Sequence, residues 1–494
     1  MSRTIHLHSG LILTDPTCEQ SASSITFTNG LVSGINQPQP PGSIGVHLHG
    51  CTLIPGLIDS HLHLVLGSRG AGDVQLAKCS SKEEFLESVQ EGKKTCGAEQ
   101  WLVCSGWNEQ TLKEFPQKSW LDPAGSTPTL CWRSDYHCAL VNDAVLELFD
   151  LDQLSQLTGG EACRSGIIKE TALWEHVCKK MPELSPAQTR TRLSATVDDL
   201  HAAGVTLVGT MEELQDIEAI LSPARTQLHV RIRAMVIGSP TTSTLKRVSS
   251  ISQDDNLKIT GFKTFADGTL GSRTAKMYAP YRDVSSSGTF VGLAASKELD
   301  LWVTRVVEAG FSPVIHAIGD EAVGLALDSS AHGTGACVPR IEHAQFIDPR
   351  DLHKLSGRWF GVQPLHLAGD ARIAQTAVGI ERAERVHAWR TMLDRGAHLS
   401  FGSDWPIAPH TPLAAMQAAI GAGVTAKEAL IASTSAAALS LSEPQAGRLD
   451  LGCYADATVL TQNPLTNDWT RNMPEIAMTI VGGEIQYKNE VANE

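Results

Sequence analysis

The stretch LIPGLIDSHLHL, residues 53–64, is the first of eight apolar segments that together decide the fold of this chain. It ends in two histidines one residue apart, His61 and His63. Side chains at positions i and i+2 of a strand project from the same side, about 6.6 Å apart along it, so both rings can reach one metal ion. Similar pairs occur earlier, in IHLHSG at 5–10 and VHLHGC at 46–51. The first question is therefore which of the three pairs can hold a metal.

From residue 204 onward, short apolar and β-branched runs alternate with polar loops and helical segments. Seven such runs follow the first one, at 204–210, 230–236, 259–267, 311–318, 340–346, 359–364 and 397–405. This alternation is typical of parallel βαβ units, and eight of them predict an α/β fold with a closed (β/α)8 TIM-type barrel. An open doubly wound sheet is the alternative, but no Gly-rich phosphate turn follows the first strand.

Roughly 140 residues separate the first two barrel strands, where a βα loop takes only a handful. We therefore expect an inserted subdomain at 68–195, which leaves the carboxyl end of the first strand as a lid that binds substrate. The barrel itself is expected at 55–67 and 196–442. Residues 1–54 and 443–494 contain short strands and turns, and we expect them to pair into one small β-sandwich domain.

The composition is that of an ordinary soluble globular protein. Hydrophobic residues make up 42% of the 494 residues and charged ones 19%, and the formal net charge is −14 without a basic cluster, which argues against a nucleic-acid partner. We see neither a signal peptide nor an apolar run long enough for a membrane span. The eleven cysteines lack a C-x-x-C pair and suit reduced thiols, so we expect a cytoplasmic protein. The expected partner is a small-molecule substrate, with a homodimer as one expected assembly.

Polar residues occur near the carboxyl ends of five of the predicted barrel strands. They are His61, His63, Lys263, His316, His343 and Asp404. A barrel of this kind assembles its active site on that rim. A single histidine at a strand end is more often a hydrogen-bonded core residue, but six such residues on one rim favour a common site.

The residue types indicate a metal centre. Neutral imidazoles and a carboxylate are the ligands of catalytic Zn²⁺, which lowers the pKa of bound water to about 7 and polarises a carbonyl. An ammonium group cannot bind metal, but burial beside cations pushes a lysine toward the neutral amine. Such an amine can take up CO₂ and become a carbamate, whose two oxygens can bridge two metals.

The motifs GLIDSHLHL, GFKTFADG, VIHAIGD, IEHAQ and FGSDWP, taken together, resemble the amidohydrolase superfamily. The likeness is greatest to its amidohydrolase family 3 branch, which includes N-substituted formamide deformylases, and it covers nearly the whole chain. It implies two Zn²⁺ ions per chain, with other divalent metals as alternatives. The implied ligands are His61, His63 and Asp404 around one metal, and His316 and His343 around the other, bridged by carboxylated Lys263.

The resemblance also distinguishes the three histidine pairs. In similar proteins the metal pair follows PGLID, which selects residues 61 and 63. The upstream pairs at 6 and 8 and at 47 and 49 are then expected to be solvent-facing positions on half-exposed strands.

The expected reaction is hydrolysis of a C–N bond in a small molecule, namely an amide, N-formyl or cyclic amide group outside a peptide. Asp404 is expected to act first as general base and then as general acid. A deaminase or an ester hydrolase on the same scaffold is the alternative, and a mononuclear deaminase would not need Lys263. A second alternative is a non-catalytic scaffold protein of this family. Such relatives typically lose metal ligands, whereas the set of metal ligands here is intact.

Five further residues are candidates for substrate binding: His137, Glu170, Arg273, Asp320 and Trp107. By the resemblance, His137 faces the substrate from the insertion and Glu170 is a rival source of the metal bridge; a polar loop residue and a surface residue are the simpler interpretations. Arg273 and Asp320 follow metal-bearing strands, where polar groups orient ligands. Trp107 is a candidate wall of the pocket, although tryptophans more often simply pack.

Overall fold

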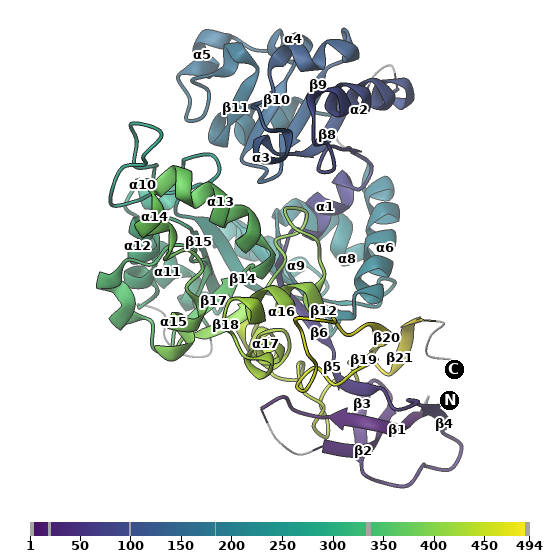
Figure 1. Ribbon diagram of the computed structural model, residues 1–494. Helices are drawn as coiled ribbons and strands as arrows, with labels where there is room; N and C mark the ends of the chain where they lie inside the picture. The colour runs from purple at the N-terminus through teal and green to yellow at the C-terminus, as the bar shows by residue number, and fades with distance from the viewer. Residues whose placement is uncertain (1–3, 18–20, 98–99, 183, 332–336, 490–494) are drawn as a thin grey trace. The chain divides into compact units, whose positions relative to one another are not determined.

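The computed structural model describes residues 4–17, 21–97, 100–182, 184–331 and 337–489 (Figure 1). The chain divides into two compact units. The first comprises residues 1–68, 186–267 and 275–494, and the second comprises residues 69–185 and 268–274. The first unit contains a barrel and a sheet made by both ends of the chain. The second contains the insertion together with a short loop that follows a barrel strand.

Eight parallel strands form the barrel, and neighbours in the chain are neighbours in the sheet. In order they are β6 (Leu57–Leu62), β12 (Val205–Glu212), β13 (Arg231–Ile237), β14 (Leu257–Phe265), β15 (Ser312–Ala317), β16 (Arg340–His343), β17 (Trp359–Val362) and β18 (His398–Phe401). Every adjacent pair from β6 to β18 is parallel. The predicted (β/α)8 barrel is therefore confirmed.

Helices lie between the barrel strands and bury one face each. They include α6 (Pro186–Ala202), α9 (Thr242–Ser250), α11 (Leu299–Glu308), α12 (Asp320–Ser330), α13 (Leu367–Val378), α15 (Trp389–Asp394) and α16 (Pro412–Gly421). In α11 the buried residues are Leu299, Trp302, Val303 and Val306, at the i, i+3, i+4, i+7 spacing of one helical face. This spacing explains why the segment forms an amphipathic helix that packs on the barrel.

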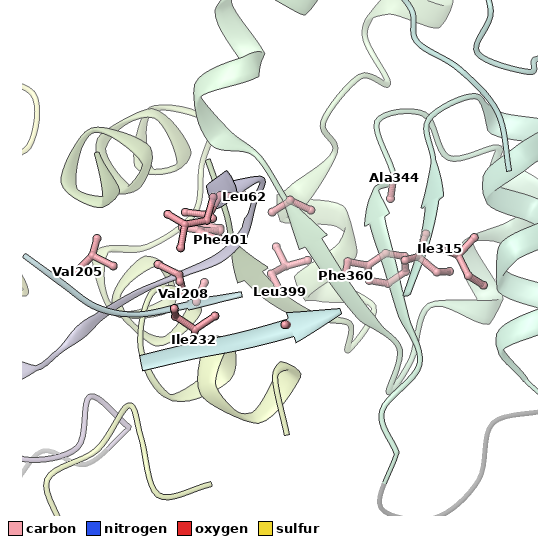
Figure 2. Packing of buried hydrophobic residues seen from close by; sticks show 14 of the residues in the cluster. Leu62, Val205, Val208, Ile232, Ile315, Ala344, Phe360, Leu399 and Phe401 are labelled. Carbon is pink, nitrogen blue, oxygen red and sulfur yellow. The ribbon is translucent and has the colours of Figure 1, made fainter. Parts of the chain in front are cut away.

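Apolar side chains of the barrel strands form a continuous core (Figure 2). Leu62, Val208, Ile315 and Phe360 are all fully buried in it. Burial of a side chain of this size stabilises the fold by roughly 1.5–3 kcal/mol relative to exposure. This packing holds the strand ends in fixed positions, and it therefore also holds the polar side chains on those ends.

The two ends of the chain pair with each other, as predicted, and they form one separate sheet. Its order is β21 (Glu484–Lys488), β20 (Ile476–Val481), β19 (Ala457–Leu460), β5 (Thr52–Pro55), β1 (Thr4–Leu13), β2 (Ser21–Thr28) and β3 (Leu31–Ile35), with β4 (Ile44–His47) branching from β1. The stretch 53–64, expected as one strand, is divided at Gly56 between β5 of this sheet and β6 of the barrel. A side chain at Gly56 would collide with Thr206, so only glycine allows the chain to pass there.

The second unit has its own sheet and core. The strands run in the order β11 (Ile167–Lys169), β10 (Cys138–Val141), β9 (Thr129–Arg133), β8 (Leu102–Trp107) and β7 (Val74–Gln75), with α2 (Lys82–Thr95) packed on them. Phe85, Trp107 and Trp120 lie in its apolar cluster. In the described part of the chain no helix has both the length and the apolar character needed to cross a membrane, and all ten described cysteines are free thiols.

Candidate metal centre

His61, His63 and Asp404 form the first group of potential ligands. His61 and His63 come from the end of β6, and Asp404 follows β18, the other edge strand of the barrel sheet. Asp404 Oδ1 lies 3.4 Å from His61 Nε2 and 3.3 Å from His63 Nε2. Two ligands bound tetrahedrally to one zinc ion at about 2.05 Å are about 3.3 Å apart. The spacing and the two-imidazole, one-carboxylate donor set therefore fit a zinc ion.

Tight backbone packing holds this group in place. Asp404 has a φ of +58°, a left-handed conformation that is unfavourable for a residue with a side chain. The neighbouring Gly402 lies against His61, since a Cβ at Gly402 would be 2.6 Å from the backbone nitrogen of His61. Glycine is thus required at 402, and the strained backbone aims the Asp404 carboxylate at the histidines.

A second group consists of His343, His366 and the same Asp404. His343 ends β16 with a φ of +71°, and His366 ends the short helix η7 (Pro364–His366) after β17. His366 was not among the ligands predicted from the sequence, although the stretch VQPLH at 362–366 places a histidine just beyond a barrel strand. Because Asp404 belongs to both groups, the two potential metal positions are adjacent.

His316, the other predicted ligand of this metal, ends β15 beside His343. The two ring centroids are 4.4 Å apart. His316 Nε2 also lies 3.7 Å from Asp267 Oδ1, and Asp267 accepts hydrogen bonds from the backbone N–H groups of Ile318 and Gly319. Asp267 thus ties the end of β14 to the loop after β15 and lies beside the His316 ring.

Three of these histidines have their Nδ1 atoms engaged by acceptors. His61 Nδ1 lies 2.5 Å from Glu342 Oε2, His63 Nδ1 lies 3.2 Å from the carbonyl of Met211, and His343 Nδ1 lies 2.8 Å from Gln363 Oε1. With the proton on Nδ1, each ring presents the lone pair of Nε2. Metal-binding histidines usually donate the N–H of their other ring nitrogen to such an acceptor, and this hydrogen bond fixes the ring orientation and the tautomer.

Glu342 and Arg340 form a buried ion pair behind His61. Arg340 Nη2 lies 2.6 Å from Glu342 Oε1, and neither side chain is exposed. Burial by itself would raise the pKa of Glu342, but the charges of Arg340 and His61 hold it well below its usual range. Gly361 on β17 leaves room for the carboxylate. Glu342 was not predicted from the sequence, because a carboxylate within a strand gives no sign of its buried partners.

Lys263 on β14 is the one buried lysine of the centre. Burial lowers its pKa to about 8, so a fraction of the side chain is a neutral amine near neutral pH. Its Nζ makes no hydrogen bond within the described residues and lies 5.3 Å from the ring of Phe265. A buried, unpaired amine of this kind fits the carbamate bridge expected from the sequence.

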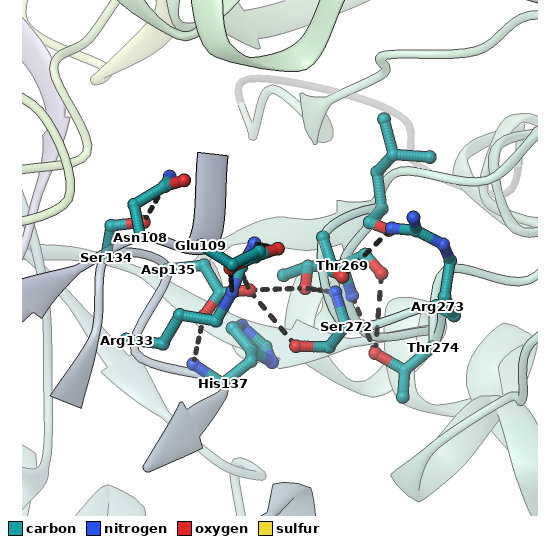
Figure 3. A network of polar contacts seen from close by, with 12 residues as sticks. Asn108, Glu109, Arg133, Ser134, Asp135, His137, Thr269, Ser272, Arg273 and Thr274 are labelled. Carbon is teal, nitrogen blue, oxygen red and sulfur yellow. Dashed lines mark hydrogen bonds and ion pairs between the residues drawn. The ribbon is translucent and has the colours of Figure 1, made fainter. Parts of the chain in front are cut away.

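His137 and Glu170 lie in the second unit and contact each other. His137 Nδ1 is 3.0 Å from Glu170 Oε2, and Glu170 Oε1 accepts a hydrogen bond from Thr274 Oγ1. Figure 3 shows the neighbouring network, in which Asp135 accepts hydrogen bonds from Arg133 and from the loop 268–274. Both oxygens of Glu170 are therefore engaged within this unit.

Two other predicted substrate residues have local structural contacts. Arg273, with a φ of +61°, donates to the carbonyls of Leu270 and Gly271 in its own loop. Asp320 opens α12 and accepts a hydrogen bond from the backbone of Tyr278.

Trp107 requires a correction. Its side chain is fully buried in the core of the second unit, and its indole N–H donates to the carbonyl of Cys131. It was expected to line a pocket, but a tryptophan with no exposed surface and a satisfied N–H is a packing residue.

A family model described as the amidohydrolase family matches residues 45–487 of the chain, a span that includes both ligand groups. The chain belongs to the amidohydrolase family. Protein LONG AFTER FAR-RED 3 of Arabidopsis thaliana is 28% identical, over 97% of this chain and 90% of that protein. The putative amidohydrolase YtcJ of Bacillus subtilis (strain 168) is 25% identical, over 97% and 99%.

A solved structure supports the same assignment. An uncharacterized metal-dependent hydrolase from Pyrococcus horikoshii OT3 is 27% identical and superposes with a TM-score of 0.77, covering 95% of this chain and 99% of that one. Family membership and the two ligand groups together identify this amidohydrolase as a metal-dependent hydrolase.

Proposed function

We propose that this amidohydrolase cleaves a non-peptide C–N bond in a small molecule, such as an amide, N-formyl or cyclic amide, with two zinc ions at the barrel rim. The observation that carries the proposal is the sharing of Asp404 between two ligand groups, His61 with His63 and His343 with His366. His316 and a carboxylated Lys263 complete the proposed donor set. When bound, the metals activate water and polarise the scissile carbonyl.

Asp404 is the proposed proton carrier. Burial alone would raise its pKa, but hydrogen bonding to His61 and His63 and the charges of neighbouring histidines hold it well below the usual range. The carboxylate is therefore charged at neutral pH, the form in which it can serve as the proposed acceptor of a proton from water. The same low pKa favours release of that proton, which Asp404 then delivers to the leaving nitrogen.

Glu342 and Arg340 act on the centre through His61. The Glu342 carboxylate holds the His61 ring through Nδ1, and Arg340 fixes Glu342 from the other side. A histidine whose second nitrogen faces a carboxylate is also a more basic ligand. These two residues are positioning groups and do not touch the substrate.

The test is a hydrolysis screen on zinc-loaded and metal-depleted protein. The substrates are N-formyl compounds, N-acyl amino acids, lactams and esters. The proposal expects turnover of C–N substrates by the loaded protein alone, restored when zinc is added back. Turnover of esters only, or release of ammonia from an aminated ring by a protein with one metal, would favour an alternative chemistry on this scaffold.

A further inference from the structure

Two of the three His-Leu-His stretches, residues 6–8 and 47–49, are not part of the barrel centre. They lie side by side in the sheet formed by the two ends of the chain, here called the terminal sheet. The strands β1 and β4 are parallel, and His8 pairs with His47 across them. His6 precedes on β1 and His49 follows β4. Four histidines distant in sequence are thus brought to one place by strand pairing.

Their rings form a chain of contacts. The centroid distances are 5.8 Å for His6 and His8, 5.3 Å for His8 and His47, and 4.3 Å for His47 and His49. Two imidazoles on one tetrahedral zinc ion have centroids about 5 Å apart, given a Zn–N bond of about 2.05 Å. The spacing therefore suits histidines that share a metal.

The barrel centre gives an internal comparison for these distances. Its ring centroids are 5.7 Å apart for His61 and His63, 5.1 Å for His61 and His343, and 4.4 Å for His316 and His343. The range in the terminal sheet is the same. The terminal cluster thus has ring spacings similar to those of the candidate metal centre in the barrel.

Hydroxyl groups orient the two rings on β1. His6 Nδ1 lies 2.9 Å from Thr26 Oγ1, and His8 Nδ1 lies 2.8 Å from Ser9 Oγ. These contacts leave Nε2 of each ring for another partner, in the arrangement typical of metal-binding histidines. Burial, and then the nearby His8, lower the pKa of His6, which keeps it in the neutral form that binds metals.

His47, at the end of β4, and His49, which follows it, are both exposed. His47 Nδ1 accepts a hydrogen bond from the backbone N–H of His49, so binding through Nε2 of His47 moves its ring proton and displaces that bond. The donor atoms do not all converge on one point as they lie, so a shared ion would require the exposed His47 and His49 rings to rotate toward those of β1.

We propose that His8, His47 and His49, with His6 as a fourth imidazole, form a second binding site for a divalent transition-metal ion, distinct from the barrel centre. An all-imidazole donor set suits zinc, nickel or copper(II). In the barrel sheet every strand but the two at the ends has partners on both sides. Among the described strands β4 pairs with β1 alone, and its four residues are largely exposed. A shared ion would therefore fasten β4 to the sheet.

The experiment is calorimetric titration with Ni²⁺ at neutral pH of enzyme that holds zinc in the barrel centre only, prepared with two zinc ions per chain and freed of excess zinc. The variants are His47→Gln with His49→Gln, and separately His8→Gln. The matched control is His176→Gln with His229→Gln, since these two histidines are also exposed but lie elsewhere. Circular dichroism checks that each variant is folded.

The wild type and the control are expected to take up one Ni²⁺ per chain that the double variant does not. His8→Gln is expected to weaken this binding at least about tenfold, and hydrolytic activity is expected to be unchanged in all of them. Equal nickel uptake by the wild type and the double variant would overturn the site. Unchanged affinity in His8→Gln would also overturn it, because the ion would not then bridge the two strands.

Discussion

The backbone N–H of Asp404 donates a hydrogen bond to the carbonyl oxygen of His61, at 2.7 Å. A second bond runs from the N–H of His63 to the carbonyl of Trp405. These two bonds join the first barrel strand to the chain beyond the last one, at the rim where the ligands lie. The relative position of the ligands therefore depends on closure of the barrel.

Replacing Gly402 with alanine tests this dependence. The new Cβ would lie 2.5 Å from Cβ of His61, so the first and last strands must separate. We expect Gly402→Ala to lose metal and activity. Gly421→Ala is the control, because nothing lies within 4 Å of that position on α16, and there we expect unchanged metal content and stability equal or greater by about 0.4–1 kcal/mol. Full metal content in Gly402→Ala would show that closure does not position the ligands.

Glu342→Gln tests the group behind His61. Because loss of such an outer partner typically costs 10–100-fold in metal affinity, we expect a fall of about that size with the fold intact. Competition with a zinc chelator measures it. The control is Glu381→Gln on the surface, where no change is expected. An affinity equal to that of the wild type would mean that Glu342 has only a packing role.

Asp404→Asn keeps the shape of the side chain but removes the carboxylate that carries the proton. General acid–base groups contribute typically 10²–10⁴-fold, so we expect kcat to fall by about that factor with KM much less affected. Metal content measured on the same sample separates loss of the proton carrier from loss of metal. A turnover within a few-fold of the wild type would assign the general base to another residue.

A stability prediction with a defined pH dependence concerns Glu428. It completes a capping box with Thr425 and pairs with Arg390 at 2.8 Å. Burial would raise the pKa of Glu428, but Arg390 and Thr425 lower it to about 2 in the folded state, from an ordinary value of 4.5. A depressed carboxylate pKa contributes stability above about pH 4.5, and this contribution is lost as the pH falls toward 2.

We therefore expect Glu428→Gln to lower the free energy of unfolding by about 1 kcal/mol at pH 7. The difference from the wild type should shrink between about pH 5 and pH 3, where the wild-type carboxylate progressively loses its advantage. Urea unfolding across this range measures it. A difference that stays constant with pH would assign the effect to something other than ionisation of Glu428.

The sequence predicted the barrel because its signals are local. Each strand is a short apolar run, and the parallel arrangement follows from the helices between the runs. The placement of His61 and Asp404 at strand ends followed from the same reasoning. In contrast, the role of Glu342 depends on His61 of β6, which is distant in sequence, and on Arg340 of its own strand, and no local pattern reveals this combination. His366 was missed because it lies in a short helix beyond its strand rather than at the strand end.

The terminal sheet shows another limit of local patterns. His6 was expected to face solvent, but it is only 4% exposed. The cause is topological, since β1 has β2 on one edge and β4 and β5 on the other and so lies inside the sheet. The alternation of residues along β1 does not reveal that the strand lies inside the sheet. It also does not reveal that the two His-Leu-His stretches, 6–8 and 47–49, become neighbours.

The metal content of the protein tests the account most directly, by elemental analysis of the His47→Gln, His49→Gln variant, in which only the barrel centre remains. We predict two zinc ions per chain. Adding Lys263→Ala should reduce this number and abolish activity, and short carboxylic acids at high concentration should restore part of both by supplying the bridging oxygens. A fully active protein with one metal per chain would contradict the binuclear centre. Retention of two metals in Lys263→Ala, with their loss in Glu170→Gln, would contradict the lysine bridge and assign it to the glutamate.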